Sequence, residues 1–199
     1  MFLRIKKIKG KEYAYIVKNE WKTIPKSSRQ KVIGYAGRVY RFDLKNNIDF
    51  LQFMKMDNLE DYTINGNINK IITDLIEWEL FKFGISRQEF SIDLNDFNNI
   101  KIQKNNRNVV FLINDGFMCN LTLKNIFYFK SEGDEQTDGY RLARAFVEAG
   151  IKVPQEIFIG IFGNVHSSWK SFVVEQRVEV YFSERFWSSC ERNWWVSEN

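Results

Sequence analysis

Short runs of alternating apolar and polar residues occupy the first 45 positions of the chain and are separated by turn signals. Residues 2–8 roughly alternate apolar with basic side chains, and residues 12–18 place Tyr13, Tyr15 and Val17 on one face and Ala14 and Ile16 on the other. Lys9-Gly10-Lys11 between the two runs is typical of a hairpin turn. Because a period of two is the mark of a half-buried strand, this block is predicted to fold as a small antiparallel sheet.

Two further strands are expected in this block after a polar loop at residues 22–28. They cover residues 29–35 and 38–42 and are separated by Ala36-Gly37. Alternation predicts aromatic side chains on one side of the sheet and Lys and Arg on the other. The four tyrosines of the block have two possible roles, as stacking platforms for unpaired bases or as the core of the module, and we favour the core. They are Tyr13, Tyr15, Tyr35 and Tyr40.

Positive charge is concentrated in the same block. Residues 1–45 hold thirteen Lys and Arg and three acidic residues, whereas the remainder holds sixteen basic and twenty-two acidic residues. A dense basic module joined to a mildly acidic body indicates docking on a polyanion, with nucleic-acid phosphates as the expected partner. The alternative is a solvated lysine face that protects a sheet edge. The predicted nucleic-acid-binding residues are Arg4, Lys6, Lys7, Lys9, Lys11, Lys26, Arg29, Lys31, Arg38 and Arg41.

Helical and strand patterns mix in the rest of the chain, which predicts an α+β fold. The expected domains are a basic β-sheet module at residues 1–45 and a mixed α/β body at residues 46–199. A helix is predicted over residues 67–83, with Asn67 as N-cap and Gly84 as its stop. A second helix is predicted over residues 139–149, with Asp138 as N-cap.

The loops and turns of the body are also predicted. Residues 85–107 are expected to be a loop with one strand at residues 100–103, and Asn114-Asp115-Gly116 is a strong turn signal. A short strand running into a helix is favoured for residues 117–129. Residues 131–137 are expected to form a solvated acidic loop rather than a site for a hard cation.

The C-terminal segment alternates strictly over residues 172–182 and predicts a strand. The aromatic tail that follows it either packs on the body or forms a surface for a partner, and both alternatives remain open. A strand with a free edge next to such a tail favours a homodimer through residues 165–199. The tail aromatics are Phe186, Trp187, Trp194 and Trp195.

The residues that carry most enzyme chemistry are scarce. His166 is the only histidine and is expected on the surface, and two cysteines, Cys119 and Cys190, are expected as reduced, buried thiols. We therefore expect no catalytic residues, no metal site and no cofactor. The enzymatic alternative is a metal-dependent nuclease that uses Asp93, Asp96 or Asp115.

Membrane attachment is not expected either. The first residues carry their charges inside the apolar stretch, which is unlike a signal peptide. No run approaches the eighteen or so apolar residues that a spanning helix needs. The predicted location is the cytoplasm.

One segment resembles a known family. The strings Lys11-Glu-Tyr-Ala-Tyr-Ile-Val and Ser28-Arg-Gln-Lys-Val-Ile-Gly-Tyr-Ala-Gly-Arg-Val, with Trp21 between them, resemble the amino-terminal segment of DDE-type insertion-sequence transposases. That resemblance implies DNA binding. The chain is too short to hold the catalytic core of such enzymes after residue 85, so their strand-transfer activity is not expected.

The body resembles a different group. Ile113-Asn-Asp-Gly-Phe-Met-Cys and Gly139-Tyr-Arg-Leu-Ala-Arg-Ala-Phe-Val-Glu-Ala-Gly are similar to segments of stand-alone archaeal proteins. That resemblance suggests association with the ribosome, in small-subunit dimerisation or hibernation. The favoured hypothesis is a non-enzymatic protein that contacts RNA phosphates on a ribonucleoprotein. The alternatives are a DNA-binding protein derived from a transposase module, the nuclease, and a protein whose basic face meets an acidic protein.

Overall fold

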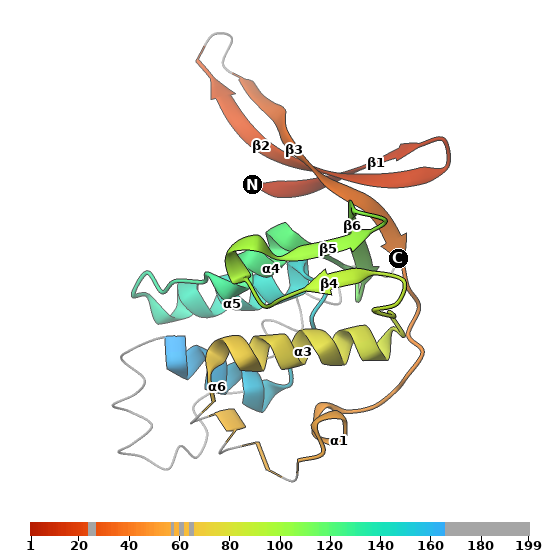
Figure 1. Cartoon of the computed structure of the whole chain (residues 1–199). Helices are drawn as coiled ribbons and strands as arrows, with labels where there is room; N and C mark the ends of the chain where they lie inside the picture. Colours follow the sequence, from red (N-terminus) through yellow and green to blue (C-terminus); the bar gives the residue numbers. More distant parts are fainter. Residues whose placement is uncertain (24–26, 57, 60–61, 64–65, 166–199) are drawn as a thin grey trace, which may run out of the picture.

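The computed structural model describes residues 1–23, 27–56, 58–59, 62–63 and 66–165 (Figure 1). Its fold is α+β, with strands concentrated at the N-terminal end and helices after them. The described elements are β1 (Phe2–Ile8), β2 (Lys11–Lys22), β3 (Ser27–Arg41), α1 (Phe50–Met54), α3 (Ile68–Lys82), β4 (Ser91–Asp93), η1 (Phe97–Asn99), β5 (Lys101–Lys104), β6 (Arg107–Ile113), β7 (Gly116–Met118), α4 (Asn120–Phe127), α5 (Glu135–Glu148) and α6 (Gln155–Val165).

The strands form one mixed sheet in the order β1-β2-β3-β6-β5-β4, and β7 pairs with β6. Strands β1, β2 and β3 are antiparallel, which confirms the predicted antiparallel module. The sheet continues into the body because Arg38–Arg41 of β3 pair in parallel with Val109–Leu112 of β6. The predicted division of the chain near residue 45 stays a prediction.

Strand β3 differs from the sequence prediction. Two strands separated by Ala36-Gly37 are predicted, whereas β3 runs unbroken from Ser27 to Arg41. The pairing of β3 with β2 shifts its register at two places, one of them next to Ala14, and the strand continues through both. Gly37 has a φ of +147°, a conformation that residues with a β-carbon rarely adopt. The glycine therefore bends the strand onto β6 without ending it.

Two hydrophobic clusters lie on opposite faces of β3 and β6. On one face, Tyr40 and Phe111 join the large core beneath the helices, where the Phe90 ring meets both rings edge-on. On the other face, Val39 and Val110 pack in a smaller cluster with Ala14, Ala36 and Cys119. Successive residues of a strand point to opposite faces, so neighbouring positions contribute to different clusters. The smaller cluster joins the basic module to the body.

The predicted helix limits are partly confirmed. The Asn67 side chain accepts the backbone N–H of Asn69 and caps α3, and Gly84 follows the helix with a φ of +60°. The cap predicted at Asp138 is wrong, because α5 begins at Glu135 and its N-cap is Asp134. Asp138 lies within the first turn of α5, where it is fully buried.

The region between α3 and β6 is more regular than predicted. Strand β4 pairs with β5 where a loop with one strand is expected, and Ile92 and Ile102 of these strands fill the core. Strands of three or four residues carry too few apolar positions for alternation to show. The turn at Asn114-Asp115 is confirmed, with φ values of +45° and +62°.

A buried ion pair holds α3 against two distant loops. The Glu79 carboxylate accepts hydrogen bonds from Lys82 Nζ at 2.9 Å, Asn114 Nδ2 at 2.9 Å and the backbone N–H of Lys152 at 2.8 Å. The Lys82 ammonium also lies 3.5 Å from the centre of the Trp78 ring. Burial raises the pKa of Glu79 and lowers that of Lys82, and each charge offsets part of the other's shift.

Candidate nucleic-acid interface

The hairpin register places cations and tyrosines on the same face of the sheet. Arg4 is the cross-strand neighbour of Tyr15, and Lys6 is the neighbour of Tyr13. Cross-strand neighbours project to the same side of a sheet, so these four side chains share a face. The prediction that aromatic and basic side chains separate to opposite sides is therefore wrong. Alternation within each strand does not determine how the two strands are aligned.

Three tyrosines meet on this face and form what we call the tyrosine patch: Tyr13, Tyr15 and Tyr35. The Tyr35 ring centroid lies 6.4 Å from that of Tyr13 and 5.5 Å from that of Tyr15. Tyr35 is 47% exposed, and the other two are half-buried. The core role predicted for the tyrosines is thus wrong for the patch, whereas Tyr40 does pack against the core.

Tyr35 in the tyrosine patch carries no negative charge near neutral pH. Partial burial raises the pKa of Tyr35, and the neighbouring rings of Tyr13 and Tyr15 raise it further. The phenol therefore stays protonated and does not repel a phosphate backbone. It presents an aromatic face and an O–H group, which is the combination that stacks on a base and donates a hydrogen bond.

Cations surround the patch. Lys6 Nζ lies 5.2 Å from the centre of the Tyr15 ring. Arg38 is the cross-strand neighbour of Tyr13, and its guanidinium lies 4.8 Å from the centre of the Tyr40 ring. Among the described residues, the buried Nε of Arg38 has no hydrogen-bond partner. An unsatisfied buried donor costs free energy unless a ligand accepts its hydrogen bond.

Two further cations come from the body. Lys104 Nζ lies 5.3 Å from the centre of the Tyr40 ring and also contacts Glu89. Arg107, its cross-strand neighbour, is close enough to Tyr35 to lower the pKa of that tyrosine slightly. Sequence reasoning missed both residues because they lie far outside the basic block. No local signal marks them, since the pairing of β3 with β6 brings Arg107 to Tyr35 and Lys104 to Tyr40.

Other predicted binding residues lie on the opposite face of the sheet, where they are close to acidic side chains. Arg41 forms two hydrogen bonds with Glu12, at 2.9 and 3.0 Å, and these lower the pKa of Glu12. Lys7 is the cross-strand neighbour of the same glutamate. Lys31 lies 3.5 Å from Glu20. Positive charge on this side is therefore partly neutralised.

The remaining predicted residues lie at the ends of the hairpins. Lys9 is in the turn between β1 and β2, with a φ of +48°. Lys11 begins β2 opposite Ile8. Arg29 lies on β3 opposite Glu20. Lys26 lies outside the described residues.

The three carboxylates of the nuclease alternative serve local turns. Asp93 accepts the backbone N–H of Asn95, and Asp96 caps η1 by accepting the N–H of Asn98. Asp115 lies in the turn between β6 and β7. Within the part of the chain that the structure describes, no group of three or more His, Cys, Asp or Glu side chains is arranged to hold a metal ion.

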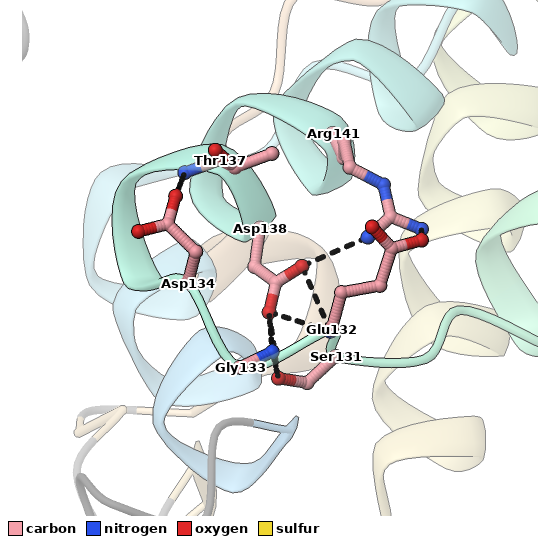
Figure 2. Close-up of polar contacts among 7 residues, drawn as sticks. All are labelled: Ser131, Glu132, Gly133, Asp134, Thr137, Asp138 and Arg141. Atoms are coloured by element: carbon pink, nitrogen blue, oxygen red, sulfur yellow. Dashed lines mark hydrogen bonds and ion pairs between the residues drawn. The ribbon is translucent and has the colours of Figure 1, made fainter.

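The acidic loop before α5 folds back on a buried carboxylate (Figure 2). Asp138 accepts hydrogen bonds from Ser131 Oγ at 2.6 Å, from the backbone N–H groups of Glu132 and Gly133, and from Arg141. Burial alone would raise the pKa of Asp138, but these hydrogen bonds outweigh it and hold the pKa below its usual value. Residues 131–137 are exposed, as predicted, although residues 135–137 belong to α5, and the buried carboxylate of Asp138 orders the loop.

A groove between α4 and α5 is also lined by cations, among them Lys124, Lys130 and Arg144. Arg144 donates to Glu148 at 2.7 Å, and Arg141 at the same groove is bound to Asp138 and Glu132. Two of the groove's arginines are therefore engaged within the protein. The tyrosine patch combines exposed rings with a donor that has no partner, and we regard it as the stronger candidate site.

Several predicted features lie beyond the described residues, namely His166, Cys190, the strand at residues 172–182 and the aromatic tail. The homodimer that depends on them stays a prediction. In the described ranges, no helix is long and apolar enough to cross a membrane.

Comparisons of the chain with protein-family models, with curated proteins and with solved structures found no match. The resemblances to transposase amino-terminal segments and to archaeal proteins therefore stay predictions. The function has to be argued from the residues of the sheet.

Proposed function

We propose that this protein is a non-enzymatic RNA-binding protein, and that single-stranded RNA lies on the sheet face that carries the tyrosine patch. The observation that supports this most strongly is the meeting of Tyr13, Tyr15 and Tyr35 on an open face next to Lys6 and Arg38. Aromatic side chains on a sheet stack on unpaired bases, and flanking cations neutralise the phosphates. The resemblance of the body to ribosome-associated proteins favours RNA on a ribonucleoprotein over DNA.

The energetics of the site fit a ligand of this kind. Stacking of one base on an aromatic side chain contributes about 1–3 kcal/mol. The Nε–H of Arg38 is buried without a partner, and it gains a phosphate or base oxygen as acceptor when the side chain turns outward toward the ligand. Most of the remaining affinity comes from the release of counterions, so binding should weaken steeply with salt.

Lys6 and Lys7 provide a matched test of the proposed face. They are adjacent in β1 and both exposed, but Lys6 lies over the Tyr15 ring and Lys7 lies opposite Glu12. Binding is measured by fluorescence anisotropy with a labelled RNA of about 12 nucleotides, within the site sizes of single-strand binders. Lys6→Ala should weaken binding more than Lys7→Ala, although both remove one charge.

Tyr35 provides the second arm of the test. Tyr35→Ala should weaken binding about tenfold or more, whereas Tyr35→Phe keeps the ring and should bind nearly as well as the natural protein. Urea unfolding of each variant checks that the fold is retained. Equal effects of the two lysine variants, together with unchanged binding by Tyr35→Ala, would rule out this face. A DNA of the same sequence that binds more tightly than the RNA would reverse the choice of nucleic acid.

A further inference from the structure

Strands β2 and β3 extend well beyond β1. The ladder between β1 and β2 ends at the pair of Phe2 with Val17, whereas the ladder between β2 and β3 continues from Lys18–Lys31 to Lys22–Ser27. Residues 18–22 and 27–31 therefore form a two-stranded arm, which projects away from the helices in Figure 1. A two-stranded ribbon adds little stability by itself. The length of the arm is better explained by a ligand than by the fold.

Trp21 lies on the arm and is 68% exposed. It is six residues beyond Tyr15 on β2, and this even spacing places it on the same side of β2 as the tyrosine patch. Its cross-strand neighbour is Ser28, whose small exposed side chain leaves the indole uncovered. An open indole on a charged surface is a platform for a planar ligand.

Arg4 occupies the surface between the tyrosine patch and the arm. It is the cross-strand neighbour of Tyr15, and its Nη1 donates a hydrogen bond to Oε1 of Gln30 in the arm at 2.9 Å. A guanidinium at this place can hold the phosphates that connect bases bound at the two ends.

The charge of the arm selects the kind of ligand. Lys18, Arg29 and Lys31 are exposed on the side of the arm that faces away from Trp21, and Glu20 is the single acidic residue in positions 18–22 and 27–31. The like charges of a second arm would oppose self-association. A polyanion with planar groups can stack on the indole and place a phosphate on Arg4 of the same side, which is the chemistry of a single-stranded nucleic acid.

We infer that the arm is a second stacking site, at which Trp21 holds a base of the same RNA strand that occupies the tyrosine patch. The inference rests on the proposed function, and it further specifies how long the bound RNA must be. Six residues of strand span about 20 Å, so the RNA must be several nucleotides long to reach both sites. Occupation of one site raises the effective concentration of the strand at the other.

The test compares two lengths of oligouridine, about 4 and 12 nucleotides, because single-strand sites of this kind cover that range. Affinities of the full chain are measured by fluorescence anisotropy at one salt concentration. Trp21→Ala should weaken binding of the long oligonucleotide about tenfold and that of the short one less than about twofold, since one stacked base is lost. Trp21→Phe should restore most of the affinity for the long oligonucleotide.

Val32→Ala is the matched control, because Val32 is also exposed on β3 at 47% but has no ring to stack. It should leave both affinities within about twofold, as surface substitutions normally do. If Trp21→Ala leaves the long oligonucleotide unaffected while Tyr35→Ala weakens it, the arm is not a second site and the proposed function stands. An equal loss at both lengths also overturns the two-site arrangement. If the natural protein binds neither oligonucleotide, the proposed function fails and this inference fails with it.

Discussion

The backbone of Gly37 lies so close to Asn108 that a β-carbon added at position 37 would be 2.5 Å from the Asn108 carbonyl oxygen. This contact lies where β3 begins to pair with β6, at Arg38 and Val109. It therefore couples the basic module to the body. Arg107 lies near Tyr35 and Lys104 lies near Tyr40 because of the same junction.

Gly37→Ala is expected to destabilise the protein. The added carbon would clash with backbone atoms of β6 at a φ that alanine rarely adopts, so the cost should be several kcal/mol, at the upper end of single substitutions. Gly34→Ala is the control, because its β-carbon would meet the Ile16 side chain at an ordinary 3.5 Å. Urea unfolding measures the free energy of unfolding of both variants. Equal stability of the two variants would contradict the close approach.

The buried pair of Glu79 and Lys82 leads to a second prediction. Lys82→Met leaves the Glu79 carboxylate buried without its cation and should lower the free energy of unfolding by about 3–5 kcal/mol. Glu79→Gln combined with Lys82→Met removes both charges and keeps one acceptor oxygen, for the backbone N–H of Lys152 but not for Asn114, so it should recover part of the loss. A double variant as unstable as Lys82→Met would show that the charge of Glu79 is not the cause.

The free energy of unfolding of the Lys82→Met variant should also depend on pH, in the direction that the pKa of Glu79 sets. Burial raises the pKa of Glu79 above its usual 4.5, so the folded state holds the proton more tightly than the unfolded state. The variant should therefore regain stability as pH falls toward 4.5 and lose it as pH rises through the folded-state pKa. Unfolding free energies measured across that range test the sign.

The stabilising effect of Asp138 is expected to depend on pH in the opposite direction. Its pKa is held below the usual 3.8 by hydrogen bonds that favour the carboxylate, so its stabilising effect is complete above that value and disappears as pH falls through the lower folded-state pKa. Asp138→Asn should cost about 2 kcal/mol at neutral pH, because bonds from a charged acceptor are lost. The difference between the variant and the natural protein should shrink in acid. A difference that is constant with pH would contradict the role of the charge.

Arg38 should separate binding from stability. Its Nε–H has no partner among the described residues, so Arg38→Met removes an unsatisfied donor and should change the free energy of unfolding by no more than about 1 kcal/mol. The same substitution should weaken RNA binding and lower the slope of log affinity against log salt by about 1. Unchanged binding and slope would mean that Arg38 does not contact the RNA.

Local features of the fold follow from short stretches of sequence. The turn at Asn114-Asp115, the cap at Asn67 and the stop at Gly84 depend on hydrogen bonds and dihedral angles within a few residues. The same holds for the hairpin at Gly10, which joins β1 to β2 as predicted. Such interactions involve residues that are adjacent in the chain, so the residue types alone predict them.

The choice between Asp134 and Asp138 as the cap of α5 needed the tertiary structure. Both are acidic residues that can cap a helix, and the local pattern led to the wrong choice of Asp138. Burial of Asp138 against Ser131 and Arg141 decides it, because a carboxylate that is already satisfied there leaves the cap to Asp134. Interactions across a folded loop do not leave a periodic signal.

The basic character of the module and its strands were determined by the sequence itself, since charge and alternation are properties of consecutive residues. The composition of the candidate site was decided only by the tertiary structure. The alignment of β1 with β2 places Lys6 beside the tyrosines, and the pairing of β3 with β6 brings Arg107 to Tyr35, which lies 72 residues before it in the chain. Strand register and long-range pairing arise from packing of the whole core, which no single segment encodes.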